Sequence, residues 1–371
     1  MAAAQGIELP GADLAAARTE PRVSAALGAV PPAYFEEAVE VAERAFGPES
    51  IERSYRVGGL DCRVRYASPA VEAAIHRALA HLERPARSAA ELSIHVWDSA
   101  RAEEALPEPH EIMLLYYRNH CLALCSDARY LALDERWLAA KSFIDRERGE
   151  AWYCLEGIER LPYYQRAAPL RSVLNALFGP RRRHLIHAAA LGTPAGGVLL
   201  PGPSGVGKSS TALSCLGGSL GYLADDWCGL WESDEPRIFS VYGSAKLCTD
   251  NVGRFPELRE RVQGYDTMDR EKATLFLGEH WPGALLAECA ARAILLPELA
   301  GGERTEIEPA PRRQAWQALL ESTLSQLPGC EPNSAAELIT RTCARLPAYR
   351  LKLGTDRDGV REAVETFMAS S

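Results

Sequence analysis

The spacing of apolar and polar positions divides the chain into a first part of mixed helices and strands and a second part in which strands alternate with helices. After Pro31 the run YFEEAVEVAERAF places apolar residues at helical spacing, whereas residues 54–66 alternate in the manner of strands. The same patterns predict a helix over residues 70–82 and a strand over residues 92–97. Residues 112–133 are expected to form a meander of strands, with NHC and SDAR as turns.

A seam is predicted near residues 161–183, where prolines and glycines bracket a short helical run, RSVLNALF. Beyond it the pattern predicts a strand at 197–200, a loop, a helix from Lys208 to about Leu216, and a strand at 220–224. Parallel strands joined by a helix are typical of an α/β core. An amphipathic helix over residues 312–327 is expected to cover its sheet with the apolar side chains of Trp316, Leu319, Leu320 and Leu324.

We therefore predict three segments. A loosely ordered leader rich in Ala, Gly and Pro occupies residues 1–30, an α+β domain follows over residues 31–165, and an α/β domain takes residues 166–371. The composition, with 47% hydrophobic and 25% charged residues, is that of an ordinary globular protein.

Charge and hydropathy exclude several classes of function. A net charge of -9 argues against a protein that binds nucleic acid over its whole surface, because such proteins need positive faces. The sequence contains neither an apolar run of about 18 residues nor a secretory signal, so we expect a cytoplasmic protein without a membrane partner. The ten cysteines contain no CxxC pair and are expected to be reduced. Cys121 and Cys125 are the only near pair, and no partner set for a zinc site follows them.

The strongest chemical signal is GPSGVGKS, residues 202–209, which fits G-x-x-x-x-G-K-[ST] without deviation. Its glycines allow successive amide hydrogens to turn inward around phosphate oxygens, while Lys208 reaches the β- and γ-phosphates and Ser209 ligates magnesium. The loop follows the apolar run GGVLL and opens a helical run, as this mechanism requires. The alternative is a glycine-rich turn that binds no nucleotide. The predicted nucleotide-binding residues are Gly202, Pro203, Ser204, Gly205, Val206, Gly207, Lys208, Ser209 and Ser210.

Two adjacent acids, Asp225 and Asp226, follow the predicted strand in GYLADDW. A carboxylate at the end of a strand beside a phosphate loop is where the second protein contact to magnesium lies. The other carboxylate of the pair is suited to accept the proton of an attacking hydroxyl. Successive strand residues face opposite ways, so both acids reach the site only if the strand ends or bends there. The alternative is an acid pair that forms a turn or caps a helix.

His187 lies fifteen residues before Gly202, at the start of an apolar run that can pair with residues 197–200 as a hairpin. Taken alone it is more typical of a buried core histidine. In this order and spacing, however, His187, GPSGVGKSS and GYLADDW resemble the catalytic domain of HPr kinase/phosphorylase and the wider group of HprK-like serine kinases, whose fold relatives are the phosphoenolpyruvate carboxykinases. The resemblance covers residues 185–232 and extends more loosely over 167–296.

The resemblance implies a P-loop kinase core that uses ATP and Mg²⁺. In it Lys208 and Ser209 serve phosphate and metal, Asp225 is the base that activates a serine hydroxyl, Asp226 is the metal-side carboxylate, and His187 orients the base or tunes it electrostatically. The chain departs from HPr kinase at Pro203 and Ser210, where that family has acidic residues, and these departures argue against HPr as the substrate and against phosphorylase activity. The architecture is closer to divergent members that accompany peptide-natural-product genes, including lasso-peptide tailoring kinases.

The function expected from the sequence is a kinase of a serine or threonine hydroxyl on a peptide or protein, with a small-molecule hydroxyl as an alternative acceptor. A P-loop ATPase or regulatory nucleotide-binding protein is the rival, although LSGGQ-like and NKxD-like segments are absent. A binding module without catalysis is a third possibility, and a homo-oligomer is compatible with all three. The sequence offers further candidate cations, which are Lys246, Arg270 and Lys272 for the transferred phosphoryl group and the run Arg181, Arg182, Arg183 and His184 for an acidic peptide.

Overall fold

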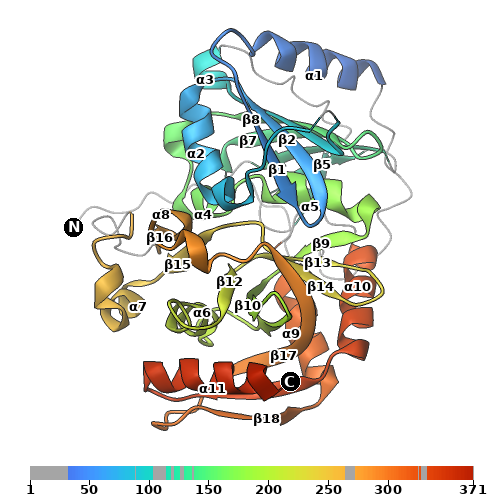
Figure 1. The fold of residues 1–371 in the computed structure, drawn as a ribbon. Helices are drawn as coiled ribbons and strands as arrows, with labels where there is room; N and C mark the ends of the chain where they lie inside the picture. Colours follow the sequence, from blue (N-terminus) through green and yellow to red (C-terminus); the bar gives the residue numbers. More distant parts are fainter. Residues whose placement is uncertain are drawn as a thin grey trace, which may run out of the picture.

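The computed structural model describes residues 32–87, 89–102, 114–117, 121–125, 129–135, 138–263, 272–324, 326 and 332–370. Within this part the chain is a mixed α/β protein in which an eight-stranded sheet is stacked on a nine-stranded sheet (Figure 1). A separate two-stranded ribbon is formed by β15 (Ser244–Leu247) and β16 (Ala273–Phe276), and α8 (Leu277–His280) directly follows β16. The leader predicted for residues 1–30 lies outside the described residues. In the described part no helix combines the length and the apolar character that crossing a membrane requires.

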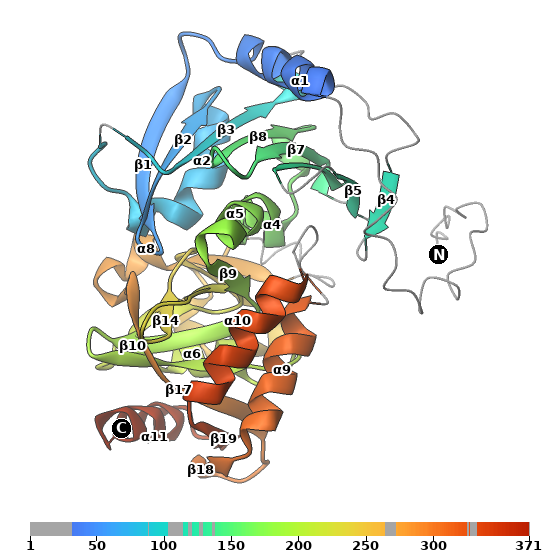
Figure 2. The ribbon, with the colours of Figure 1, turned by 90° about the vertical axis from the view of Figure 1, so that its right-hand side faces the viewer.

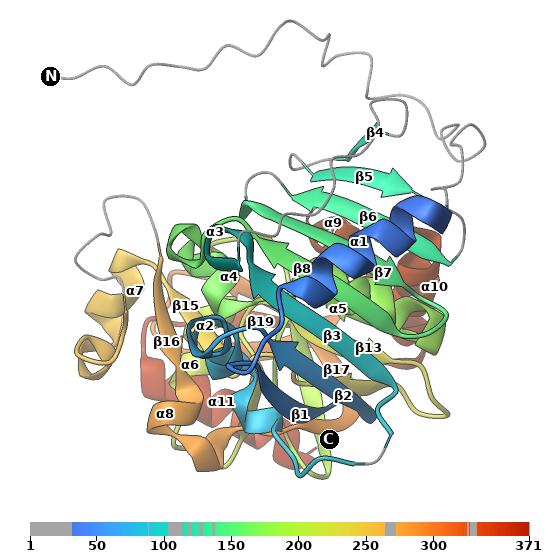
Figure 3. The same cartoon turned by 90° about the horizontal axis from the view of Figure 1, so that it is seen from above.

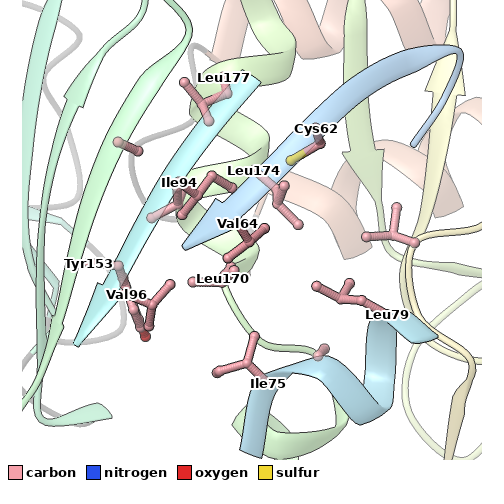
Figure 4. Packing of buried hydrophobic residues seen from close by; sticks show 14 of the residues in the cluster. Cys62, Val64, Ile75, Leu79, Ile94, Val96, Tyr153, Leu170, Leu174 and Leu177 are labelled. Atoms are coloured by element: carbon pink, nitrogen blue, oxygen red, sulfur yellow. The ribbon is translucent and has the colours of Figure 1, made fainter. Parts of the chain in front are cut away.

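The first sheet is built from the strands that alternation predicted, together with a meander that continues further along the chain. Helix α1 (Pro32–Arg44) crosses its outer face (Figure 3). Helices α2 (Pro69–Leu79) and α5 (Arg171–Phe178) cover its inner face, where Ile75 and Leu174 point toward Val64 and Ile94 of the strands (Figure 4). The order of strands is β1 (Ile51–Val57), β2 (Leu60–Tyr66), β3 (Leu92–Asp98), β8 (Glu150–Leu155), β7 (Ala140–Asp145), β6 (Tyr130–Glu135), β5 (Cys121–Cys125) and β4 (Leu114–Tyr117).

The second sheet lies between two helical layers (Figure 2). Helices α6 (Lys208–Ser214) and α11 (Arg357–Ser370) pack on one face, and α9 (Arg312–Leu324) and α10 (Pro332–Arg345) on the other, so the predicted amphipathic helix does cover the sheet. The order along the main path is β12 (Gly221–Ala224), β10 (Ala188–Thr193), β11 (Gly196–Pro201), β17 (Glu288–Leu299), β14 (Arg237–Phe239), β13 (Cys228–Trp231) and β9 (Arg183–Ile186); β19 (Ala348–Leu353) pairs with β17 and with β18 (Glu306–Ala310).

The directions of the strands decide at which edge of this sheet a ligand-binding site can form. Strand β10 is antiparallel to both β11 and β12, while β17 is parallel to β11 and β19 is parallel to β17. The carboxyl ends of β12, β11, β17 and β19 therefore meet at one edge. Ligands of open α/β sheets bind in the crevice outside such an edge.

The two halves of the chain share one hydrophobic core across the predicted seam at residue 165. Leu174 of α5 and Trp227 and Phe239 of the second half belong to the same buried cluster as the inner face of the first sheet. The polar contacts also cross the seam, since Arg77 pairs with Glu279 at 2.7 Å and His81 Nε2 lies 2.8 Å from Ser240 Oγ. Every cysteine whose side chain is described is a free thiol, in agreement with the sequence-based expectation.

We predict that His81 makes the stability of the protein depend on pH. Burial lowers the pKa of His81 to about 3, and the charge of Arg84 adds to the effect. The unfolded state, with a histidine pKa of about 6.5, binds a proton that the folded state excludes, so stability is full above that value and is lost as the pH falls toward the folded pKa. Between pH 7 and pH 5 the loss from this residue is about 2 kcal/mol.

Urea unfolding at pH 7 and pH 5 checks this prediction. His81→Gln is expected to lose about 2 kcal/mol less than the unmodified protein over the same interval, whatever its stability at pH 7. An identical pH dependence in the two proteins contradicts the assignment.

Candidate active site

The phosphate loop connects the end of β11 to the start of α6, as the sequence predicted. Gly202, Gly205 and Gly207 have φ angles of 138°, 89° and 104°, which a residue with a side chain rarely adopts. Residues 203–205 are exposed, so no packed segment among the described residues blocks the mouth of the loop. Its backbone is therefore folded and open to a ligand.

Lys208 lies under the loop rather than in solvent. Its Nζ donates to the carbonyl oxygens of Gly202 at 2.6 Å and Pro203 at 2.9 Å. Burial lowers the pKa of this ammonium, and the nearby charges of Asp226 and Asp225 oppose that shift. The lysine is thus held across the loop, close to both carboxylates, where an entering phosphate group meets its charge.

The two aspartates both reach the site because the strand that carries them ends before them. Strand β12 stops at Ala224, and the backbone bends at Asp225 and Asp226 before β13 begins at Cys228. The bend removes the alternation that would otherwise send neighbouring side chains to opposite faces. The sequence predicted that both aspartates reach one site only if the strand ends or bends at them, and the strand does so.

Lys246, which lies in the ribbon strand β15 (Ser244–Leu247), contacts both carboxylates. Its backbone N–H donates to Asp225 Oδ2 at 2.8 Å, and its Nζ donates to Asp226 Oδ2 at 2.5 Å. The sequence named Lys246 among the downstream cations, and the structure brings it into the site. It is paired with Asp226 rather than free.

The environments of the two carboxylates drive their pKa values apart. Burial raises the pKa of Asp225, and the charge of Asp226 raises it further, while Ser209 and the N–H of Lys246 lower it. Burial also acts to raise the pKa of Asp226, but the charge of Lys246 and the hydrogen bond from His187 outweigh it and hold the value well below normal. Asp226 is therefore the firmly ionised member of the pair.

His187 lies at the corner between β9 and β10, and β10 pairs with β11 as the predicted hairpin. Its Nε2 lies 2.9 Å from Asp226 Oδ1, and because that carboxylate is ionised, Nε2 carries the proton. Helix α9 fixes the corner, since the His187 N–H donates to Thr323 Oγ1 and the Ser322 hydroxyl donates to the His187 carbonyl. The histidine is therefore both a buried residue and a hydrogen-bond partner of Asp226.

The residues around Asp225 fit a magnesium ion. Asp225 is 2% exposed, yet its Oδ1 has no hydrogen-bond partner, which is costly for a buried carboxylate oxygen. Ser209 lies close enough to lower the pKa of this group. Hydroxyl and carboxylate oxygens are the ligand type that Mg²⁺ takes, with water and substrate phosphates completing its shell. No cluster of three or more His, Cys, Asp or Glu that could hold a metal occurs in the described part.

Of the remaining candidate cations, one lies near the site, one lies outside the described residues, and the run at residues 181–184 serves elsewhere. Lys272 lies near enough to Lys208 for its charge to lower the pKa of that group, whereas Arg270 lies outside the described residues. Arg181 and Arg183 donate to backbone carbonyls, the latter at 2.6 Å to Gly58, and stabilise the contact between the sheets. The remaining members of that run are His184, which is buried, and Arg182, which pairs with Glu232.

Sequence reasoning missed the residues that support the site. Trp227 packs edge-on against His187 at 5.1 Å between ring centroids, and the Arg171 guanidinium lies 5.0 Å from the Trp227 ring. Ser322 and Thr323 were read only as part of an amphipathic helix. Trp227, directly after the two aspartates, was the one signal in the sequence that pointed to these supporting residues. Its contact with His187 depends on strand pairing that the sequence does not show.

We predict that Gly207→Ala damages the loop more than Gly205→Ala does. Both glycines have positive φ, so each substitution strains the backbone by about 1–2 kcal/mol. A Cβ at position 207 would also lie 2.3 Å from Leu353 Cδ1, whereas one at position 205 meets nothing within 4 Å. The extra loss in the free energy of unfolding is expected to be about 1–3 kcal/mol for Gly207→Ala. Chemical denaturation of both variants measures it, and equal losses contradict the contact with Leu353.

Comparison with known proteins adds little to this geometry. No known family model matches the sequence, and no curated protein matches it at a significant level. One similar solved structure is that of the HPr(Ser) kinase/phosphatase from Coxiella burnetii, with a TM-score of 0.28 and 10% sequence identity over 50% of this chain and 97% of that chain.

Proposed function

We propose that the chain is an ATP- and magnesium-dependent kinase that transfers the γ-phosphoryl group to a hydroxyl group. The observation that carries the proposal is the Asp226 carboxylate, ionised, held by His187 and Lys246, and placed beside the Lys208 ammonium at the mouth of a phosphate loop. A loop that only binds a nucleotide does not need a second carboxylate with its own histidine and lysine.

The two aspartates have different tasks in this proposal, and the geometry favours the opposite division to the one inferred from the sequence. Asp225 is buried next to Ser209 and keeps an unpaired oxygen, which suits the metal side. The Asp226 side chain is 22% exposed and can meet an acceptor arriving from solvent. We therefore assign the metal to Ser209 and Asp225, and the acceptor hydroxyl to Asp226.

In the transfer step the acceptor hydroxyl gives its proton to Asp226 while its oxygen forms a bond to the γ-phosphorus. The bond from that phosphorus to the β–γ bridging oxygen breaks, and ADP carries away the electron pair. His187 holds the carboxylate in place through Nε2, and Lys208, Lys246 and Lys272 supply positive charge to the transferred group. Bound magnesium neutralises charge on the phosphate oxygens.

The proposal names the acceptor only by its chemical class. The order of His187, loop and aspartates resembles HprK-like serine kinases, so we propose a serine or threonine hydroxyl of a peptide or protein. The run from Arg181 to His184 is not assigned to this acceptor, since two of its arginines are used in packing between the sheets.

The activity itself is tested by incubating the protein with ATP labelled in its γ-phosphate and with candidate hydroxyl acceptors, and by measuring transfer of the label to the acceptor. We expect transfer that depends on the acceptor and that Lys208→Ala abolishes, because the loop loses the charge that meets the transferred group. Release of free phosphate alone would make the protein an ATPase. No turnover with intact ATP binding would make it a binding protein.

Separate substitutions at the two aspartates test the assignment of roles. Asp226→Asn is expected to leave the dissociation constant for MgATP near its original value while transfer falls by about 10²–10⁴-fold. Asp225→Asn is expected to raise the Mg²⁺ concentration for half-maximal activity by about tenfold or more. Equilibrium MgATP binding, Mg²⁺ titrations and transfer rates measured on both variants decide. The reverse pattern would restore the division inferred from the sequence.

A further inference from the structure

Among the described residues, Leu299, at the carboxyl end of β17, is the one large apolar residue that is mostly exposed, with 62% of its surface accessible. It lies next to the phosphate loop, because its Cδ2 is 3.7 Å from the point where a Cβ on Gly207 would be. Its register partner Leu353 on β19 is buried against the same glycine. Water therefore contacts a leucine at the rim of the proposed nucleotide site.

The arrangement of the sheet edge gives the direction in which a bound nucleotide runs. The residues that act on the terminal phosphate, Asp225 and Asp226, follow β12, which lies on one side of β11. Leu299 and Leu353 end β17 and β19, which lie on the other side of β11. With the γ-phosphate directed toward the aspartates, the opposite end of the triphosphate points toward the leucines.

We propose that Leu299 is a nucleobase-contact residue, covered by the face of the purine when a nucleoside triphosphate occupies the loop. This inference rests on the proposed function and deepens it, since it concerns the same site. A leucine side chain offers apolar surface and no hydrogen-bonding group, so it contributes by packing on the flat ring. Such pockets are mostly apolar, with a few polar groups that fix orientation.

Calorimetric titration of the full chain in Mg²⁺ with two ligands tests the proposal. A non-hydrolysable ATP analogue carries the base, whereas inorganic tripolyphosphate carries only the phosphates. Leu299→Ser is expected to raise the dissociation constant of the analogue by about tenfold, the effect of leaving one leucine uncovered, and to leave that of tripolyphosphate unchanged. Leu299→Met, which keeps the apolar surface, is the matched control and is expected to change neither constant by more than about twofold.

Each other outcome has a distinct meaning. Equal losses for both ligands in Leu299→Ser would make Leu299 a support of the loop, and an unchanged constant for the analogue would leave it without a ligand; both results overturn the proposal. A change only in the oligomeric state of the chain would assign the leucine to contact with a second copy and would also overturn it. If the unmodified protein bound neither ligand, the proposed function itself would fail, a result distinguishable from failure at Leu299 alone.

Discussion

The contact between Lys246 and the two aspartates is the constraint on which the site depends. One residue gives its backbone N–H to Asp225 and its ammonium to Asp226, and so holds both carboxylates at the bend that ends β12. Two like charges side by side would otherwise repel each other, and the buried Asp225 would also lose hydration. The arrangement holds the pKa of Asp226 well below normal and leaves an oxygen of Asp225 unpaired, and the proposed division of roles rests on this asymmetry.

Features encoded in short stretches of sequence were predicted correctly. The strand, glycine loop and helix around Lys208 follow from local spacing and turn chemistry, and so does the hairpin that starts at His187. The helix of residues 171–178 was also placed at its observed bounds, although its packing against the first sheet was not foreseen. These elements depend on neighbours a few residues away, where periodicity carries the information.

The remainder depends on contacts between distant segments. Strand β17 pairs with β11, β14 and β19, so neither its length nor its neighbours can be read from its own residues. The position of Lys246 beside the aspartates requires the ribbon of β15 and β16 (Ala273–Phe276) to lie over the sheet edge. The sequence could name the candidate side chains, but it could not show that Asp225 is buried while Asp226 is partly exposed, because burial is a property of the tertiary structure.

The ribbon that carries Lys246 is anchored outside the nine-stranded sheet, and this limits how the chain can be divided. Just before β15, the Gly243 N–H donates to the carbonyl of Ala78 in α2, and the Tyr242 hydroxyl donates to the Pro169 carbonyl. Arg77 of the same helix lies over the ring of Phe276 in β16. The first half of the chain thus helps to hold a ribbon that supplies a lysine to the candidate site in the second half, so replacing either half separately would disturb the position of Lys246.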